Sequence, residues 1–261
     1  MAGSVRGKVA GVLVGAALAV LAGGAQGEAP RLTLQGSTTF NSVLMAEHQA
    51  AIEAAAGVRL TVVANKSNIG LLALLDGAAD MAMLSTPLAN ELELIGRSRP
   101  GVALDRLQAV EVGRTEAALI VHPDNPVRHI SQAALRQVLA GEIVNWRGLG
   151  GADLPIRIVA VRDGGGVVTT VEMAVLGAGA HIAAPQHIRI QNGPQIVRIV
   201  EQEPGGLGIT QLKLARGRGV ARLMPETPIV QQLFLVSLGA PTAGMLAVIA
   251  ACQAWAGGGP S

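Results

Sequence analysis

The sequence predicts an α/β fold in which a largely parallel sheet is divided between two lobes. Strand-like and helix-like segments alternate along the chain from residue 31 onward, as in other α/β sheets. The segment 109–121 is apolar on both sides of Gly113, and a strand of that length can pass from one lobe to another. No low-complexity linker interrupts the chain, so we expect crossing strands to join the lobes. With 261 residues, half of them apolar, the chain can bury a substantial core.

Strands and helices alternate regularly in the first part of the chain. The expected elements are a strand over 31–35, a helix over 41–56, a strand over 59–64, a helix that Ser67 opens over 67–75, a buried strand over 79–84 and a helix over 90–97. The long strand over 109–121 follows them.

The second part begins with a helix over 131–140. Its first residue, Ser131, can accept a hydrogen bond from an early backbone N–H, and Gly141 ends it. The expected elements after it are a strand over 156–161, a helix over 169–176, a helix over 194–201, a turn over 204–206, an apolar strand over 228–238 and a closing helix over 243–256. Residues 257–261 are rich in glycine and are predicted to form a flexible tail.

Residues 1–27 have the three parts of a secretory signal peptide. A basic start with Arg6 and Lys8 precedes an apolar run over 9–22 and a small-residue exit over 25–27, so we expect cleavage near Gly27. The alternative is an uncleaved membrane anchor, but the run is shorter than the ~20 apolar residues of a spanning helix. The single cysteine, Cys252, cannot form an internal disulfide, and we expect it to be buried in the last helix.

The composition argues against several kinds of partner. The net charge is +2 and the basic residues are scattered, which predicts no nucleic-acid binding. Aromatic residues make up 2% of the chain and tyrosine is absent, so stacking platforms for sugars or bases are scarce. The histidines are dispersed and the glycine runs lack a P-loop lysine, so we expect neither a metal nor another cofactor. The sequence also lacks a Gly-x-Ser-x-Gly elbow, and we do not expect an enzyme. This composition fits a small, hard anion better than a nucleic acid, a sugar or a metal ion as the ligand.

Four stretches carry a family resemblance. They are Gly-Ser-Thr-Thr-Phe over 36–40, Asn-Lys-Ser-Asn-Ile-Gly over 65–70 leading to 80–88, His-Pro-Asp-Asn-Pro-Val over 122–127 followed by Gly141 and Trp146, and Val-Ala-Val-Arg-Asp-Gly-Gly-Gly over 159–166 with an echo over 203–209. In this set and order the chain resembles the periplasmic phosphate-binding proteins that serve ABC transporters.

The resemblance implies a two-lobed periplasmic-binding-protein fold of type II. Each lobe would be a mixed, mostly parallel sheet flanked by helices, with residues 31–118 and 226–256 in the first lobe, 119–225 in the second, and two hinge strands crossing between them. It also implies a monomer of the periplasm that binds phosphate or a related oxyanion in the cleft between the lobes and passes it to an inner-membrane ABC permease.

Hydrogen-bond donors that can surround a desolvated oxyanion follow the early strands. The hydroxyls of Thr38 and Thr39 and the N–H of Phe40 precede the helix expected from residue 41, and Ser67 opens the next helix, where the helix dipole favours an anion. We expect these four residues to contact the ligand. The alternative is that Thr39 and Ser67 only cap their own helices.

Arg162 is the candidate for charge pairing, because it ends a strand and precedes glycines whose backbone can approach a ligand closely. Its alternative role is a surface salt bridge with Asp163 or Glu172. The resemblance adds Ser85 and Gly166 to the site.

The chain departs from the family in two places. Gly166, Val167 and Val168 stand where the family has Ser-Gly-Thr, and Ser85 stands where it has a carboxylate that accepts the phosphate proton. Two other functions therefore stay open: a binder of sulfate, molybdate or a small carboxylate, and a sensor or scaffold that keeps the fold without tight binding.

Overall fold

The computed structural model describes residues 29–99, 104–162 and 166–257. The predicted signal peptide over 1–27, Asp163 and the two glycines after it, and residues 258–261 of the predicted tail lie outside these ranges. Within them, no helix combines the length and the apolar character that crossing a membrane requires.

The described residues form a ten-stranded sheet. Its strands are β1 (Arg31–Ser37), β2 (Arg59–Asn65), β3 (Met81–Leu84), β4 (Leu107–Val121), β5 (His129–Ile130), β6 (Arg157–Val161), β7 (His187–Ile190), β8 (Gly206–Gln211), β9 (Ala221–Pro225) and β10 (Val230–Leu238). The main path runs β2-β1-β3-β10-β4-β8-β6-β7, and β9 pairs with β4 and β5.

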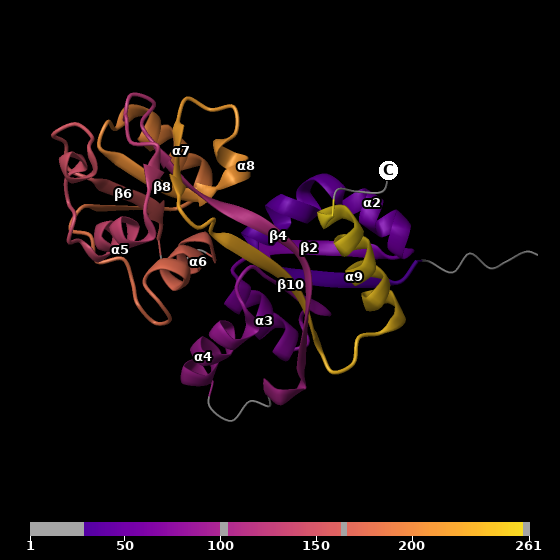
Figure 1. Ribbon diagram of the computed structural model, residues 1–261. Coiled ribbons are helices and arrows are strands. Elements are labelled where there is room, and N and C mark those ends of the chain that lie inside the picture. Colours follow the sequence, from indigo (N-terminus) through magenta and orange to yellow (C-terminus); the bar gives the residue numbers. More distant parts are fainter. Residues whose placement is uncertain (1–28, 100–103, 163–165, 258–261) are drawn as a thin grey trace, which may run out of the picture.

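The helices cover both faces of this sheet. They are α1 (Thr38–Phe40), which continues through a π-helical stretch (Asn41–Met45) into α2 (Ala46–Ala56), then α3 (Ser67–Leu75), α4 (Leu88–Ser98), α5 (Gln132–Ala140), α6 (Gly166–Val175), α7 (Gly193–Gln202), α8 (Leu212–Ala215) and α9 (Ala243–Ala256), with 3₁₀ turns at Leu104–Arg106 and Trp146–Leu149. Helices α2, α3, α4 and α9 gather around one end of the crossing strands, and α5, α6, α7 and α8 around the other (Figure 1).

Strands β4 and β10 connect the two groups of elements. They pair antiparallel from Leu107 opposite Leu238 to Glu116 opposite Val230, with a bulge between Leu233 and Phe234. On one side of this pair β1 runs parallel to β2 and β3, and on the other β6 runs parallel to β7 and β8. The sheet is therefore mixed and mostly parallel on each side, as predicted.

The hydrophobic core is divided in the same way. Two clusters draw their buried residues from positions 34–112 and 233–252, and two others from positions 117–229. The division of the core supports the predicted lobes over 31–118 with 226–256 and over 119–225. Their exact boundaries stay predictions.

Gly36 lets the end of β1 lie against β3. Its φ of +140° lies in a region that side chains rarely adopt, and a Cβ there would collide with the carbonyl oxygen of Met83. Glycine at this position lets the two strands approach closely, and this approach brings the next residue, Ser37, beside the end of β3.

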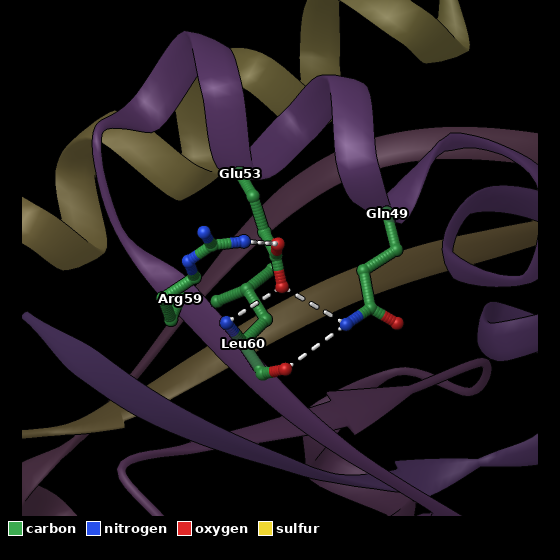
Figure 2. A network of polar contacts seen from close by, with 4 residues as sticks. All are labelled: Gln49, Glu53, Arg59 and Leu60. Atoms are coloured by element: carbon green, nitrogen blue, oxygen red, sulfur yellow. Dashed lines mark hydrogen bonds and ion pairs between the residues drawn. The ribbon is translucent and has the colours of Figure 1, made fainter. Parts of the chain in front are cut away.

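A network of polar contacts joins α2 to β2 (Figure 2). The Glu53 carboxylate accepts from the N–H of Leu60 at 2.8 Å and from Gln49 Nε2 at 3.0 Å, and Arg59 Nη1 lies 3.4 Å from its other oxygen. Gln49 Nε2 also donates to the Leu60 carbonyl at 2.9 Å. These bonds hold the pKa of Glu53 below its ordinary value, first through Gln49 and then through the Leu60 N–H.

Several predicted boundaries are confirmed. The helices over 67–75 and 243–256 match α3 and α9, and the Ser131 hydroxyl accepts from the Ala134 N–H at 3.1 Å. Gly141 ends α5 in the left-handed conformation, and Cys252 is a free, buried cysteine of α9.

Two predicted helix starts were wrong by three residues each. The first helix begins at Thr38, because Ser37 caps it, and not at residue 41. Helix α6 begins at Gly166, and not at residue 169, because Val167 and Val168 are buried in the core as part of its first turn. Strands β5, β7, β8 and β9 were not predicted.

Candidate functional site

A groove of about 740 Å³ lies between the elements around α3 and α4 and the elements around α6 and β7. One side is formed by the residues that follow β1, β2 and β3 and by α4. The other side is formed by α6, β7 and the loop before β7. Helices α3 and α6 lie on the same side of the crossing strands (Figure 1). Because β1, β2 and β3 run parallel, their carboxyl ends meet at one edge of the sheet, where ligands of α/β folds collect.

Three serines at this edge form a hydrogen-bonded cluster, which we call the serine cluster: Ser37, Ser67 and Ser85. The Ser37 hydroxyl donates to Ser85 Oγ at 2.7 Å, and the Ser85 N–H donates to Ser67 Oγ at 3.3 Å. All three residues are buried and all three line the groove. Neither the Ser67 nor the Ser85 hydroxyl donates to another described residue, so both hydroxyl hydrogens are available to a ligand.

The start of α3 adds backbone donors to the serine cluster. Its N-cap residue, Lys66, makes no side-chain capping bond, and the first N–H groups of a helix have no partner within the helix. Lys66 also lines the groove and brings a positive charge to it. This end of the groove therefore combines hydroxyls, helix N–H groups and an ammonium group.

The first turn of α6 closes the other side of the serine cluster. A Cβ on Gly166 would collide with Ser85 Oγ and would lie 3.0 Å from Gln231 Nε2. Gln231 in turn donates to the Ser85 carbonyl at 3.0 Å. Gly166 therefore lies against Ser85, while the predicted close approach of its backbone to a ligand stays a prediction.

The seven site residues predicted from the sequence do not all lie in the groove. Thr38, Ser67, Ser85 and Gly166 line it, whereas Thr39, Phe40 and Arg162 are not among its lining residues.

The Thr39 hydroxyl and the Phe40 N–H have partners within the protein. Thr39 Oγ1 accepts from Gln211 Nε2 at 3.0 Å, and the Phe40 N–H donates to Ser37 Oγ at 3.2 Å. The alternative that Thr39 and Ser67 only cap their own helices is wrong. Ser37 caps the first helix, and Ser67 is itself a residue of α3, with an Oγ that accepts from the Ser85 N–H.

Arg162 is exposed at the end of β6, and its contact with a ligand stays a prediction. Its alternative partner Glu172 is buried, and the Glu172 carboxylate accepts from the Ile182 N–H at 3.0 Å and lies 3.3 Å from His181 Nδ1.

Six charged or titratable residues of the groove were missed: Lys66, Glu91, Glu93, His181, His187 and Arg189. His187 and Arg189 belong to β7, a strand that was not predicted, although the alternation in His-Ile-Arg-Ile is a strand signal. Glu91 is buried on α4 and accepts from the Thr86 hydroxyl. Burial raises the pKa of Glu91.

Asn65 lines the groove and carries an acceptor that the described residues do not use. Its Oδ1 is hidden from solvent and has no hydrogen-bond partner among the described residues. Asp80, by contrast, has a structural role, since its carboxylate accepts from the Thr33 N–H of β1 at 2.7 Å. Within the described ranges, no group of three or more His, Cys, Asp and Glu side chains could hold a metal ion.

The mixed sheet, the crossing strands and the groove at the strand ends are features of solute-binding folds. The family model for the PBP superfamily domain matches residues 23–247, and the chain belongs to this family.

The chain is similar to the phosphate-binding protein PstS from Bacillus subtilis (strain 168), with 26% identity over 178 residues. The matched region covers 68% of this chain and 55% of PstS, so the chain spans about half the length of that relative.

Two kinds of solved structure have a similar fold. An ABC-type phosphate transport receptor from Vibrio cholerae superimposes with a TM-score of 0.67 at 18% identity, covering 85% of this chain and 93% of the receptor. The reduced regulatory domain of OxyR2 from Vibrio vulnificus has a TM-score of 0.59 at 14% identity, covering 86% of this chain and 95% of that domain. At these identities the likeness shows the fold alone, and it confirms the predicted fold class.

Proposed function

We propose that this protein captures phosphate, or a closely related oxyanion, in the groove and delivers it to an ABC-type permease of the inner membrane. The observation that carries the proposal is the serine cluster, whose hydroxyls lie at the start of α3 and opposite the first turn of α6. The names of PstS and of the Vibrio cholerae receptor, which refer to phosphate binding and phosphate transport, support it.

The chemistry of this end of the groove suits a tetrahedral anion. A desolvated phosphate needs donors on most of its oxygens, and the Ser67 and Ser85 hydroxyls, Thr38 and the first N–H groups of α3 are close at hand. The N-terminal ends of α3 and α6 both favour negative charge. Lys66 adds a full positive charge.

Asn65 favours phosphate over sulfate. At neutral pH a large share of phosphate carries a proton that must find an acceptor, and sulfate carries none. Asn65 Oδ1 would supply such an acceptor once its side chain turns toward the bound anion, although the carboxylate of the family is replaced by Ser85.

The remainder of the proposal concerns the setting of the protein. The signal peptide predicted over 1–27 would direct a monomer to the periplasm, where it would bind and release its ligand without chemical turnover. Opening and closing would bend β4 and β10, the strands that connect the two sides of the groove.

Calorimetric titration of phosphate and sulfate into the purified protein tests this function. We expect saturable phosphate binding, weaker sulfate binding and a loss of about 1.5–3 kcal/mol for Lys66→Gln, which removes a charged donor. The variant Arg162→Ala belongs in the same series, because a loss of about 2–5 kcal/mol would assign the charge pairing to Arg162.

Other outcomes would redirect the proposal. Preference for sulfate, molybdate or a small carboxylate would identify the different-anion alternative. If no oxyanion gives measurable binding, the proposed capture of phosphate is contradicted and the sensor or scaffold alternative is supported.

A further inference from the structure

The groove is larger than an inorganic phosphate ion requires. Its volume is about 740 Å³, whereas phosphate is the size of a few water molecules, each with about 30 Å³ of liquid volume. Pockets of about 300–1,000 Å³ hold organic molecules. The serine cluster occupies one end, so the chemistry of the other end bears on the identity of the ligand.

Helix α6 runs along the groove, so the rise between its lining residues measures how far the groove extends from the serine cluster. Gly166, Thr169 and Glu172 all line it, and these positions lie on one face of the helix. Gly166 lies against Ser85, and Glu172 follows six residues later, about 9 Å along the helix at 1.5 Å per residue. A ligand that contacts both ends is therefore several bonds long.

The far end of the groove is formed by β7. His187 and Arg189 are two residues apart, so their side chains lie on the same face of the sheet. Their partners on β6 are Ile158 and Ala160, which belong to the same core cluster as Val171 of α6. His187 and Arg189 therefore lie on the face that α6 covers, beside the second half of the groove.

Arg189 is the charged donor of this end. It is exposed to the groove and forms no ion pair with any described residue. The nearby carboxylate of Glu172 is engaged by the Ile182 N–H and by His181. A planar guanidinium that is open to the groove suits a carboxylate or another planar anion.

His187 adds two unused ring nitrogens. Neither has a hydrogen-bond partner among the described residues, and both are hidden from solvent. Burial, and after it the Arg189 charge, lowers the pKa of His187, while Glu172 opposes the shift. The neutral imidazole has one donor and one acceptor, and a turn of the ring on ligand binding would bring them to a carboxylate and a hydroxyl.

We propose that the groove takes a phosphate monoester of a small hydroxy acid, with the phosphate at the serine cluster and the carboxylate at Arg189 and His187. The proposal rests on the proposed function, because it keeps the phosphate site and assigns the remaining space. It makes Arg189 a specificity-determining residue for the acid group, separate from the donors that hold phosphate.

Calorimetric titration with three probes tests the inference: inorganic phosphate, glycerol phosphate and phosphoglycerate. Phosphoglycerate carries the carboxylate that glycerol phosphate lacks, and we expect it to bind about tenfold to a hundredfold more tightly. Arg189→Gln is expected to remove this advantage and leave the affinity for glycerol phosphate unchanged. The matched control is Arg198→Gln, which changes an exposed arginine of α7 outside the groove.

The two proposals fail in different ways. If phosphoglycerate binds no more tightly than glycerol phosphate, or if Arg189→Gln leaves their ratio unchanged, the inference is overturned, while phosphate binding would still support the proposed function. Binding of phosphoglycerate that depends on Arg189, without binding of phosphate, supports the inference and revises the function. If none of the three probes binds, both proposals are overturned.

Discussion

The Ser37 hydroxyl donates to the Ser85 hydroxyl over 2.7 Å and joins the carboxyl ends of β1 and β3. Ser37 also accepts the Phe40 N–H, so its oxygen and its hydrogen are both engaged within the protein. Ser85 keeps its own hydroxyl hydrogen, and its position is fixed from one side by Ser37 and from the other by Gln231. The pair therefore presents one preorganised donor at the bottom of the groove.

Asn65→Ala is expected to weaken phosphate binding about tenfold, the effect of one lost hydrogen bond, and to leave sulfate binding unchanged. The reason is that Asn65 Oδ1 is an acceptor, which only the protonated oxygen of phosphate can use. Calorimetry with both anions on the same variant measures the ratio. An equal loss for both anions would show that Asn65 has no part in selectivity.

Gly166→Ala is expected to lower phosphate affinity and the free energy of unfolding together. The added Cβ would collide with Ser85 Oγ, so either the serine or the start of α6 must move. The control is Gly96→Ala in α4, where nothing lies within 4 Å of the added Cβ and a gain of about 0.5–1 kcal/mol is expected. Unchanged binding by Gly166→Ala would separate the first turn of α6 from the site.

Glu53→Gln is expected to lower the free energy of unfolding at neutral pH by about 1 kcal/mol, because the hydrogen bonds of the carboxylate lose their charge. Since the pKa of Glu53 is lower in the folded protein, its contribution is present above the ordinary value of 4.5 and is lost as pH falls through the folded-state pKa. Denaturant unfolding across this range, with exposed Glu142→Gln as the control, checks the sign. A difference that grows in acid would contradict it.

Cys252 is expected to resist thiol reagents in the native protein at mildly alkaline pH. Its side chain is fully buried, and burial raises the pKa of the thiol to about 12. Denaturant should release one reactive thiol per chain, because the sequence has a single cysteine. Rapid labelling without denaturant would show that α9 detaches readily from the sheet.

Much of the fold could be predicted because its signals are local. Ser131 and Gly141 mark the two ends of α5 by capping chemistry, and α3 and α9 are apolar segments with clear limits. Strand β8 was missed because its sequence, Gly-Leu-Gly-Ile-Thr-Gln, begins in an apparent turn. Its central place in the sheet depends on pairing with β4 and β6, which are far away in the sequence.

The site was predicted in part for the same reason. Ser67 and Ser85 follow recognisable strands, and the groove contains both. Which of the hydroxyls after β1 face the groove is decided by the turn at Gly36 and by Gln211, a residue of the unpredicted β8 that binds Thr39. Arg189 could not be found without the strand that carries it.

The central claim is that phosphate binds at the serine cluster between α3 and α6. A crystal structure of the protein grown with phosphate tests it most directly. The account predicts a phosphate whose oxygens accept from the hydroxyls of Ser67 and Ser85 and from N–H groups at the starts of both helices. A phosphate bound elsewhere, with the serine cluster still closed upon itself, would contradict it.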